Sequence, residues 1–221
     1  MTPTSTTGEL LPLLVIAFAI GLLPFVAMMV TSYTKIVVVL GLLRNAMGVQ
    51  QVPPNMVLNG IAIIVSCYIM APIIMDASQA LNSTQPVAGD SNAQQIIRAA
   101  DSAREPFRSF LDKHAHEKEK VFFLKSAAVI WPPDRAKALK KDDLIVLAPA
   151  FLLTELSASF RIGFLLYLAF VVIDMVIANV LLAMGLSQVT PTNVAIPFKL
   201  LLFVVLDGWS RLIHGLVLTY K

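Results

Sequence analysis

The sequence predicts an all-α integral membrane protein on three grounds: an apolar composition, long uncharged runs and one charged central segment. Of the 221 residues, 57% are hydrophobic and 14% are charged, with a mean hydropathy of +0.77; average globular proteins have about 25% charged residues. No charged side chain occurs in 10–34, 45–75 or 175–198. Each run reaches the ~20 residues that a helix needs to cross a bilayer core. A soluble protein of this size has too little interior to bury three such helices.

We expect about four hydrophobic helical stretches in two kinked hairpins. The first stretch, 10–32, carries Gly21 and Pro24, where we expect a kink or break. No Lys or Arg precedes it and no Ala-x-Ala site ends it, so we expect it to be retained rather than cleaved as a signal peptide. The apolar segment 36–43 is too short to span a membrane and is expected to be a connector. The second stretch, 55–75, begins after two consecutive prolines.

The composition divides the chain into an N-terminal hydrophobic hairpin (1–75), a polar helical domain (76–143) and a C-terminal hydrophobic hairpin (144–221). The central segment holds 11 Lys/Arg and 10 Asp/Glu. This nearly balanced and dispersed charge gives no footprint for nucleic acid. We expect the central segment to be a small water-facing domain with an apolar face to bury.

Within the central domain, 77–92 is expected to be a linker because Ser, Asn, Gln, Pro and Gly dominate it. Apolar residues then recur at three- and four-residue spacing, which predicts one stripe on a helix. Pro106 should kink or restart this helix, and a second short helix is expected at 117–129. The stripe residues are Ile96, Ile97, Ala100, Ala103, Phe107, Phe110 and Leu111.

The C-terminal hairpin is expected to begin after Asp142-Asp143, a favourable helix start. Its first stretch, 144–185, is long enough for a full span plus a shorter helix. Pro149, Glu155 and Arg161 interrupt its first part, and Asp174 lies in its second. A loop with two prolines and a glycine follows at 185–197. The last stretch is 198–220.

The positive-inside rule favours a cytoplasmic connector, because the short segment between the first two stretches carries Lys35 and Arg44. This orientation places the N-terminus, the central domain and the C-terminus outside, with the 185–197 loop on the inner side.

Ionisable residues in apolar helices are costly and are functional candidates. Asp207 and Arg211 are spaced i, i+4 in the favourable order for an ion pair on one helix face. Asp174 has no partner within four residues, so it must find one on another segment, reach water or stay protonated. Glu155 and Arg161 point in different directions and are expected at an interface or a helix end. Lys199 completes this set of buried or intersubunit polar residues.

Other polar residues within the apolar runs are candidates for hydrogen bonds between helices, and three glycines for close helix approach. The polar candidates are Asn59, Ser66, Asn179, Thr190 and Asn193, and the glycines are Gly60, Gly163 and Gly215.

The sequence holds no Gly-rich phosphate loop, no Cys/His zinc spacing and no Ser/His/Asp set. We therefore expect neither an enzyme nor a bound cofactor or metal. His114 and His116 diverge on a helix and are expected on a solvated face. The lone Cys67 permits no internal disulfide and is expected to be a small apolar residue.

Three segments together resemble the SctR/FliP family of type III secretion export-apparatus proteins, and the similarity covers nearly the whole chain. The segments are TSYTKIVVVLGLLRNAMGVQQVPPN at 31–55; FRIGF at 160–164 with Ile173-Asp174; and IPFKLLLF at 196–203 with Asp207-Gly208-Trp209. The length, the central domain and the lack of a cleavable signal favour the injectisome branch (SctR, also HrcR or YscR) over the flagellar branch.

The resemblance implies a homopentamer that assembles with SctS and SctT into a helical export gate in the bacterial inner membrane. It also implies contacts with SctU, SctV and inner rod proteins, passage of unfolded substrate proteins, and seeding of the rod and needle. The central domain would be periplasmic, and many of the apolar helices would pack against one another above the bilayer.

Many relatives carry consecutive methionines after the glycine of the last loop, where they form a gasket that closes the channel. Here this part of the loop reads Met184, Gly185, Leu186, Ser187, Gln188 and Val189. Leu186 keeps an apolar side chain, whereas Ser187 and Gln188 are polar, so a gasket at 184–189 is a hypothesis. The rival functions are an ion-coupled small-solute transporter that uses Asp174 and the Asp207/Arg211 pair, and a passive membrane scaffold.

Overall fold

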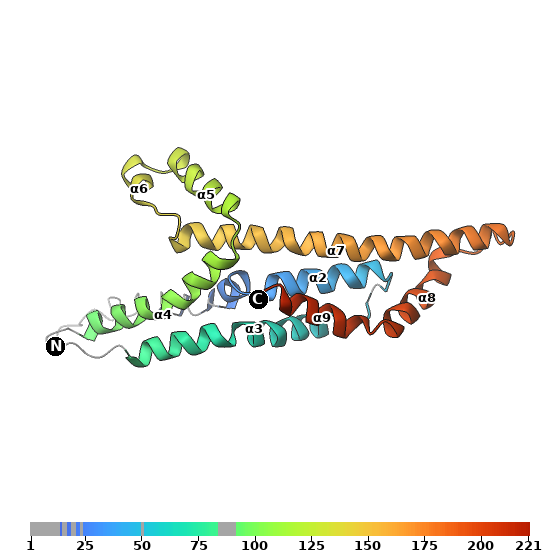
Figure 1. The fold of residues 1–221 in the computed structure, drawn as a ribbon, viewed down its shortest axis with the longest axis horizontal. Helices are drawn as coiled ribbons and strands as arrows, with labels where there is room; N and C mark the ends of the chain where they lie inside the picture. The colour runs from blue at the N-terminus through green and yellow to red at the C-terminus, as the bar shows by residue number, and fades with distance from the viewer. Residues whose placement is uncertain (1–13, 15–16, 19–20, 23, 50, 84–91) are drawn as a thin grey trace, which may run out of the picture.

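The computed structural model shows an elongated bundle of helices arranged along one long helix (Figure 1). It describes residues 14, 17–18, 21–22, 24–49, 51–83 and 92–221, and these contain helices and no strand. In chain order the helices are α2 (Tyr33–Ala46), α3 (Asn55–Ser83), α4 (Asn92–His114), α5 (Glu117–Ile130), α6 (Pro133–Ala138), α7 (Leu144–Ala183), α8 (Pro191–Val205) and α9 (Gly208–Leu218). The predicted all-α class is confirmed. The predicted first stretch, 10–32, lies largely outside the described residues.

Helix α7 is the axis of the molecule. It has 40 residues in one continuous helix, about 60 Å long at about 1.5 Å per residue. The expected span plus a shorter helix is therefore wrong. Pro149 lies inside α7 without ending it, because Leu147, Ala150 and Phe151 around it are fully buried and their packing holds the helix together. The predicted start is confirmed, since Asp143 is the N-cap.

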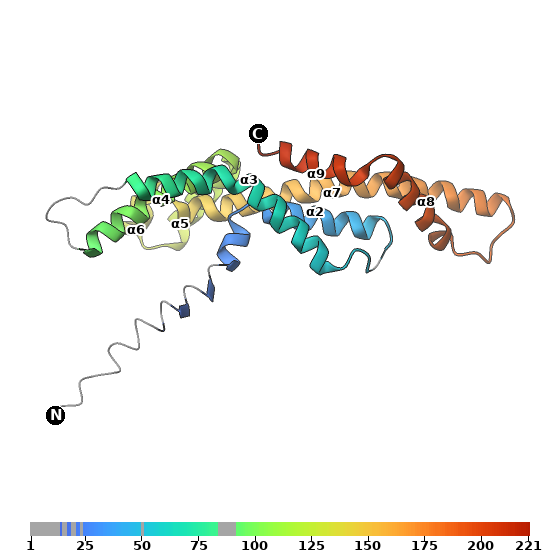
Figure 2. The ribbon, with the colours of Figure 1, turned by 90° about the horizontal axis from the view of Figure 1, so that it is seen from below.

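Helix α2 lies alongside α7, with α3 on its other side (Figures 1 and 2). Ile36, Val39, Leu40 and Leu43 of α2 are completely buried. The expected connector at 36–43 is thus wrong, because this segment is the middle of a packed helix. Its burial also removes Lys35 from the set of loop charges on which the positive-inside argument depended.

The close approach of α2 and α7 occurs at Gly163. A Cβ atom at this position would lie 2.2 Å from Cδ1 and 3.0 Å from Cβ of Leu42. The hydroxyl of Ser32 also donates a hydrogen bond of 2.9 Å to Ser66 of α3. These contacts confirm the predictions for Ser66 and Gly163. A Cβ atom added at Gly60 or Gly215 would meet nothing within 4 Å, so neither glycine serves a close approach among the described residues.

The central domain packs on the first half of α7. Helix α3 continues to Ser83, so 77–83 is helical and the expected linker is wrong there; 84–91 lie outside the described residues. Helix α4 runs through Pro106 without restarting. The predicted stripe is confirmed at its C-terminal end, where Phe110 and Leu111 join Met70 and Phe151 in one core cluster. Helix α5 matches the expected 117–129, and the short α6 follows Trp131-Pro132.

The chain returns along α7 as a bent pair, α8 and α9, whose axes differ by 63°. The bend is at Asp207, a non-glycine residue in the left-handed region with φ 51° and ψ 47°. Gly208 follows, and a side chain there would collide with the ring of Phe203. Because α8 begins at Pro191, the expected 185–197 loop is too long, and residues 191–197 are helical.

Among the described residues, α3 and α7 are long and apolar enough to cross a membrane, and the bent pair α8–α9 would be a third span if it counts as one. The four expected stretches thus become two or three candidate spans in this part of the chain.

Candidate functional site

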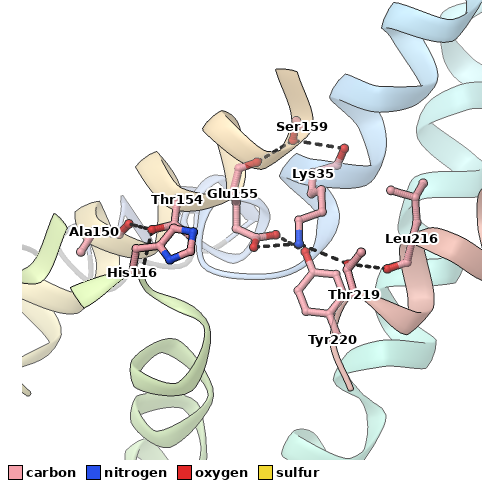
Figure 3. Close-up of polar contacts among 9 residues, drawn as sticks. All are labelled: Lys35, His116, Ala150, Thr154, Glu155, Ser159, Leu216, Thr219 and Tyr220. Carbon is pink, nitrogen blue, oxygen red and sulfur yellow. Dashed lines mark hydrogen bonds and ion pairs between the residues drawn. The ribbon is translucent and has the colours of Figure 1, made fainter. Parts of the chain in front are cut away.

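A buried ion pair joins α2 to α7 near the middle of the molecule (Figure 3). The Nζ atom of Lys35 lies 3.0 Å from Oε1 of Glu155, and their side chains are 6% and 3% exposed. The same ammonium donates a hydrogen bond of 3.3 Å to the hydroxyl of Thr219. Two charges removed from water are tolerable only when they are paired and hydrogen-bonded. Of the positions expected for Glu155, the structure shows the buried polar one, with its partner inside the chain and away from a helix end.

The C-terminal residues close this site. The hydroxyl of Tyr220 donates a hydrogen bond to Oε2 of Glu155, and the Tyr220 ring lies 4.1 Å from the Lys35 ammonium in a cation–π contact. Burial and the Glu155 carboxylate raise the pKa of Tyr220 above its ordinary value, so the phenol stays neutral and acts as a donor. The site thereby ties the end of the chain to α2 and α7.

His114 forms the wall on the side of α4. Its ring lies 4.8 Å from the Phe110 ring and 5.2 Å from the Tyr220 ring. Burial, helped by the cations Lys113 and Lys35, lowers the pKa of His114 to about 4. The expected solvated face is thus wrong for His114, which is half-buried, and correct for His116, which is exposed.

A second polar pair joins α8 to α7. The Nζ atom of Lys199 lies 2.6 Å from Oδ2 of Asp174 and donates a hydrogen bond of 3.2 Å to the carbonyl of Ala46 at the end of α2. The Lys199 side chain is 4% exposed and that of Asp174 39%. Oδ1 of Asp174 is buried and has no hydrogen-bond partner. Of the three alternatives expected for Asp174, the structure shows the first, a partner on another segment.

The remaining predicted charges lie on the surface. Arg161, Asp207 and Arg211 are exposed. Within residues 24–49, 51–83 and 92–221, no ion pair joins Asp207 to Arg211, so the predicted pair on one helix face is wrong. The reason is the bend: Asp207 caps α9 with its carbonyl, which accepts a hydrogen bond of 3.1 Å from the Arg211 amide.

The loop between α7 and α8 lies at one end of the molecule (Figure 1) and residues 184–190 are exposed. The α7 terminus has the Schellman pattern, with Leu186 N–H bonded to Leu181 at 2.9 Å and Gly185 N–H to Leu182 at 3.0 Å. Gly185 has a φ of 72°, which favours glycine. This cap fixes where the loop leaves the helix and presents the side chains of Met184 and Leu186 to solvent.

The sequence predicted Glu155, Asp174 and Lys199 as candidates but missed the residues that complete the site around Glu155, which are Lys35, Thr219 and Tyr220. A signal was available, because Lys35 is the first charge after the long uncharged run 10–34 and such a charge needs an opposite one nearby. In the described residues, no group of three or more His, Cys, Asp or Glu side chains could hold a metal ion.

In the part of the chain that the structure describes, candidate membrane spans joined by two ion pairs indicate a helical membrane protein. The chain belongs to the FliP family of type III secretion export-apparatus proteins, whose model matches residues 15–216. This confirms the resemblance drawn from the sequence motifs.

Curated relatives match along almost their whole length. The hypersensitivity response secretion protein HrcR of Ralstonia nicotianae is 68% identical over 96% of this chain and 98% of its own. The Yop proteins translocation protein R of Yersinia pestis is 46% identical, with 94% of this chain and 95% of the relative covered. The virulence protein YscR of Salmonella typhimurium is 41% identical over 96% and 97%. A role for this chain in the secretion apparatus follows from these matches.

Proposed function

We propose that this chain is a core structural subunit of the type III secretion export gate. Several copies, with SctS and SctT, would form the conduit through which unfolded proteins cross the bacterial inner membrane. The assembly would contact SctU and SctV and nucleate the inner rod and needle. In this proposal the central domain, 76–143, is periplasmic.

The observation that carries this proposal is the exposed apolar surface of α7. Large apolar side chains are exposed from Ile145 near its start, through Phe164, to Leu182 near its end. This surface extends over most of the helix's length of about 60 Å, whereas a bilayer core is about 30 Å thick. Even with a typical tilt of about 20°, lipid would cover only about half of α7. Neighbouring protein subunits are the natural cover for the rest.

The polar architecture supports the same proposal. The Lys35–Glu155 and Asp174–Lys199 pairs hold the subunit's own helices together. Asp207 and Arg211, in contrast, are exposed in a region where Val204 and Val205 are exposed too. An exposed charge on such a surface is favourable only where water or a partner subunit meets it.

The loop at 184–189 would act as the gasket of the closed gate. Its support is the exposed position at one end of the molecule and the apolar Met184, Leu186 and Val189 side chains. Ser187 and Gln188 would make this seal more polar than one built from consecutive methionines.

Native mass spectrometry tests the proposal. The chain would be purified in mild detergent, alone and co-expressed with SctS and SctT. We expect a discrete homo-oligomer of five copies that gains the smaller subunits on co-expression. A stable monomer or dimer that ignores those subunits would overturn the proposal and move the ion-coupled transporter, with Asp174 as its first target, ahead. A chain that binds the other subunits while its deletion leaves secretion intact would support the scaffold instead.

A further inference from the structure

Two opposite charges at the α8–α9 bend have no side-chain partner among the residues that the structure describes. Asp207 makes no side-chain capping bond, and within residues 24–49, 51–83 and 92–221 neither Asp207 nor Arg211 forms an ion pair or a side-chain hydrogen bond. Both side chains are exposed. The left-handed conformation of Asp207 ends α8 and turns the chain by 63°, which removes the two residues from a continuous helix face.

The surroundings of these charges are apolar. Val204 and Val205, directly before the bend, are 73% and 71% exposed. Arg211 lines a groove of about 500 Å³ between α7 and the α8–α9 pair, with Leu166, Phe170 and Leu212 among its walls. Gly215 also lines this groove, and a Cβ atom there would meet nothing within 4 Å. The groove is therefore open to the close approach of another protein segment.

An unpaired carboxylate and an unpaired guanidinium on an apolar surface are costly once lipid or protein covers that surface. Each needs an opposite charge from another molecule. Because one chain carries both the acid and the base at the same bend, a second copy can satisfy both. A head-to-tail contact repeated around a ring uses the acid of one subunit and the base of the next.

We propose that Arg211 of one copy pairs with Asp207 of the neighbouring copy, so that the α8–α9 bend is an interface between subunits. This inference rests on the proposed homo-oligomer and adds to it which charged residues meet at the contact between neighbouring copies. The exposed Arg161 has a different setting, because it lines a polar hollow with Glu117 and Glu119 of α5. Arg161 is therefore the matched control.

The test is a mixing experiment with two single charge reversals, Asp207→Arg and Arg211→Asp, each with its own affinity tag. Expressed alone, each variant places like charges at every contact. We expect the oligomer-to-monomer ratio in native mass spectra to fall by at least about tenfold, since close interfacial charge pairs are worth more than 1.4 kcal/mol. Co-expressed, the two variants restore opposite charges wherever unlike subunits meet. We expect mixed oligomers to return, carrying both tags.

Mixing distinguishes contacts between copies from contacts within one chain, because a within-chain pair cannot be repaired by a second polypeptide. The control mixes Asp207→Arg with the double variant Asp207→Arg/Arg161→Asp, which adds the acid on α7 instead of at the bend; no recovery is expected. Suppose that the wild type forms the oligomer, but the two charge-reversal variants either stay monomeric when mixed or assemble even when expressed alone. Either result would overturn the inference and leave the proposed function standing. A monomeric wild type would overturn the proposed function itself.

Cross-linking covers the case in which a reversal fails to fold. Asp207→Cys and Arg211→Cys are placed on separate co-expressed chains that also carry Cys67→Ala. A short bifunctional maleimide should link the two chains into a covalent dimer only when both are present. The pairing would be contradicted by a dimer band of equal strength from either chain alone. It would also be contradicted if the mixture of the Asp207→Cys and Arg211→Cys chains gave no dimer band.

Discussion

At the scale of single residues, the stability of the folded chain depends on buried charges that are paired with each other. Lys35 and Glu155 are 120 positions apart in the chain, yet their side chains meet at 3.0 Å in the interior. Tyr220, one residue from the C-terminus, completes the site by donating to Glu155. Because both charges are buried, removing one should cost far more than removing both.

Lys35→Met should therefore destabilise the chain by about 3–5 kcal/mol, since it leaves Glu155 buried without its cation. The double variant Lys35→Met/Glu155→Gln should recover most of this loss because no charge remains. Thermal unfolding in detergent measures both. Equal destabilisation of the single and double variants would mean that the two residues are not energetically coupled. Lys125→Met, at an exposed position, is the control.

His114 gives the site a pH dependence. Its pKa is lowered to about 4 in the folded chain, against about 6.5 in an unfolded chain, so the unfolded state binds more protons between these values. Stability should fall as the pH drops from about 6.5 towards 4 and be unaffected by His114 above pH 7. His114→Asn should flatten this part of the stability profile, measured by denaturant unfolding from pH 7 to pH 4.5. An unchanged slope in the variant would exclude His114 as the cause.

At the scale of the elements, α2 and α7 form the unit on which the other helices pack. Their contact depends on Gly163, where Leu42 fills the space of the absent side chain. The bend between α8 and α9 depends in the same way on Gly208, against which the Phe203 ring lies. At both positions, the absence of a side chain lets neighbouring side chains pack closely, and this packing sets how the helices are arranged.

Gly163→Ala should destabilise the chain by about 1–3 kcal/mol, as overpacking does, despite the higher helix propensity of alanine. Adding Leu42→Ala should relieve the collision and recover part of the loss. Gly41→Ala is the control, because nothing lies within 4 Å of a Cβ atom there. Thermal unfolding compares the variants; a Gly163→Ala chain as stable as the Gly41→Ala chain would contradict this packing argument.

The α7–α8 loop gives a second prediction for an element. Replacing Leu186, Ser187, Gln188 and Val189 together by glycine should leave the cap at Gly185 intact but remove the side chains of the proposed gasket that follow it. Cells that carry the assembled gate should then leak small dyes or ions that the wild type retains. Unchanged impermeability, with assembly verified by native mass spectrometry, would count against sealing by this loop.

At the scale of the whole molecule, the exposed apolar surface exceeds what one bilayer can cover. Single cysteines at Ile145, Phe164 and Leu182, in a Cys67→Ala background, would report on this surface by maleimide labelling. In the isolated chain, lipid should protect only one stretch of about 20 residues. In the assembled complex all three positions should be protected. Protection of the same short stretch in both states would indicate that lipid, not protein, covers α7.

The sequence alone determined the class, the helical content and the family, because these depend on hydropathy, on spacing and on motifs that are contiguous in the chain. It also located the N-cap at Asp143 and most candidate charges. It misjudged α2 as a connector and α7 as two helices, because a charge or a proline in an apolar run looks like an interruption until its partner or its packing is known.

Only the tertiary structure decided which charges meet. Glu155 pairs with Lys35 and Asp174 with Lys199, across separations in the chain that no periodicity records. The same structure separated Asp207 from Arg211, although their spacing favours a pair, because the backbone turns at Asp207. Which charges meet depends on how the helices bend and pack in space. The helical content, in contrast, follows from the order of apolar residues, which can be read directly from the sequence.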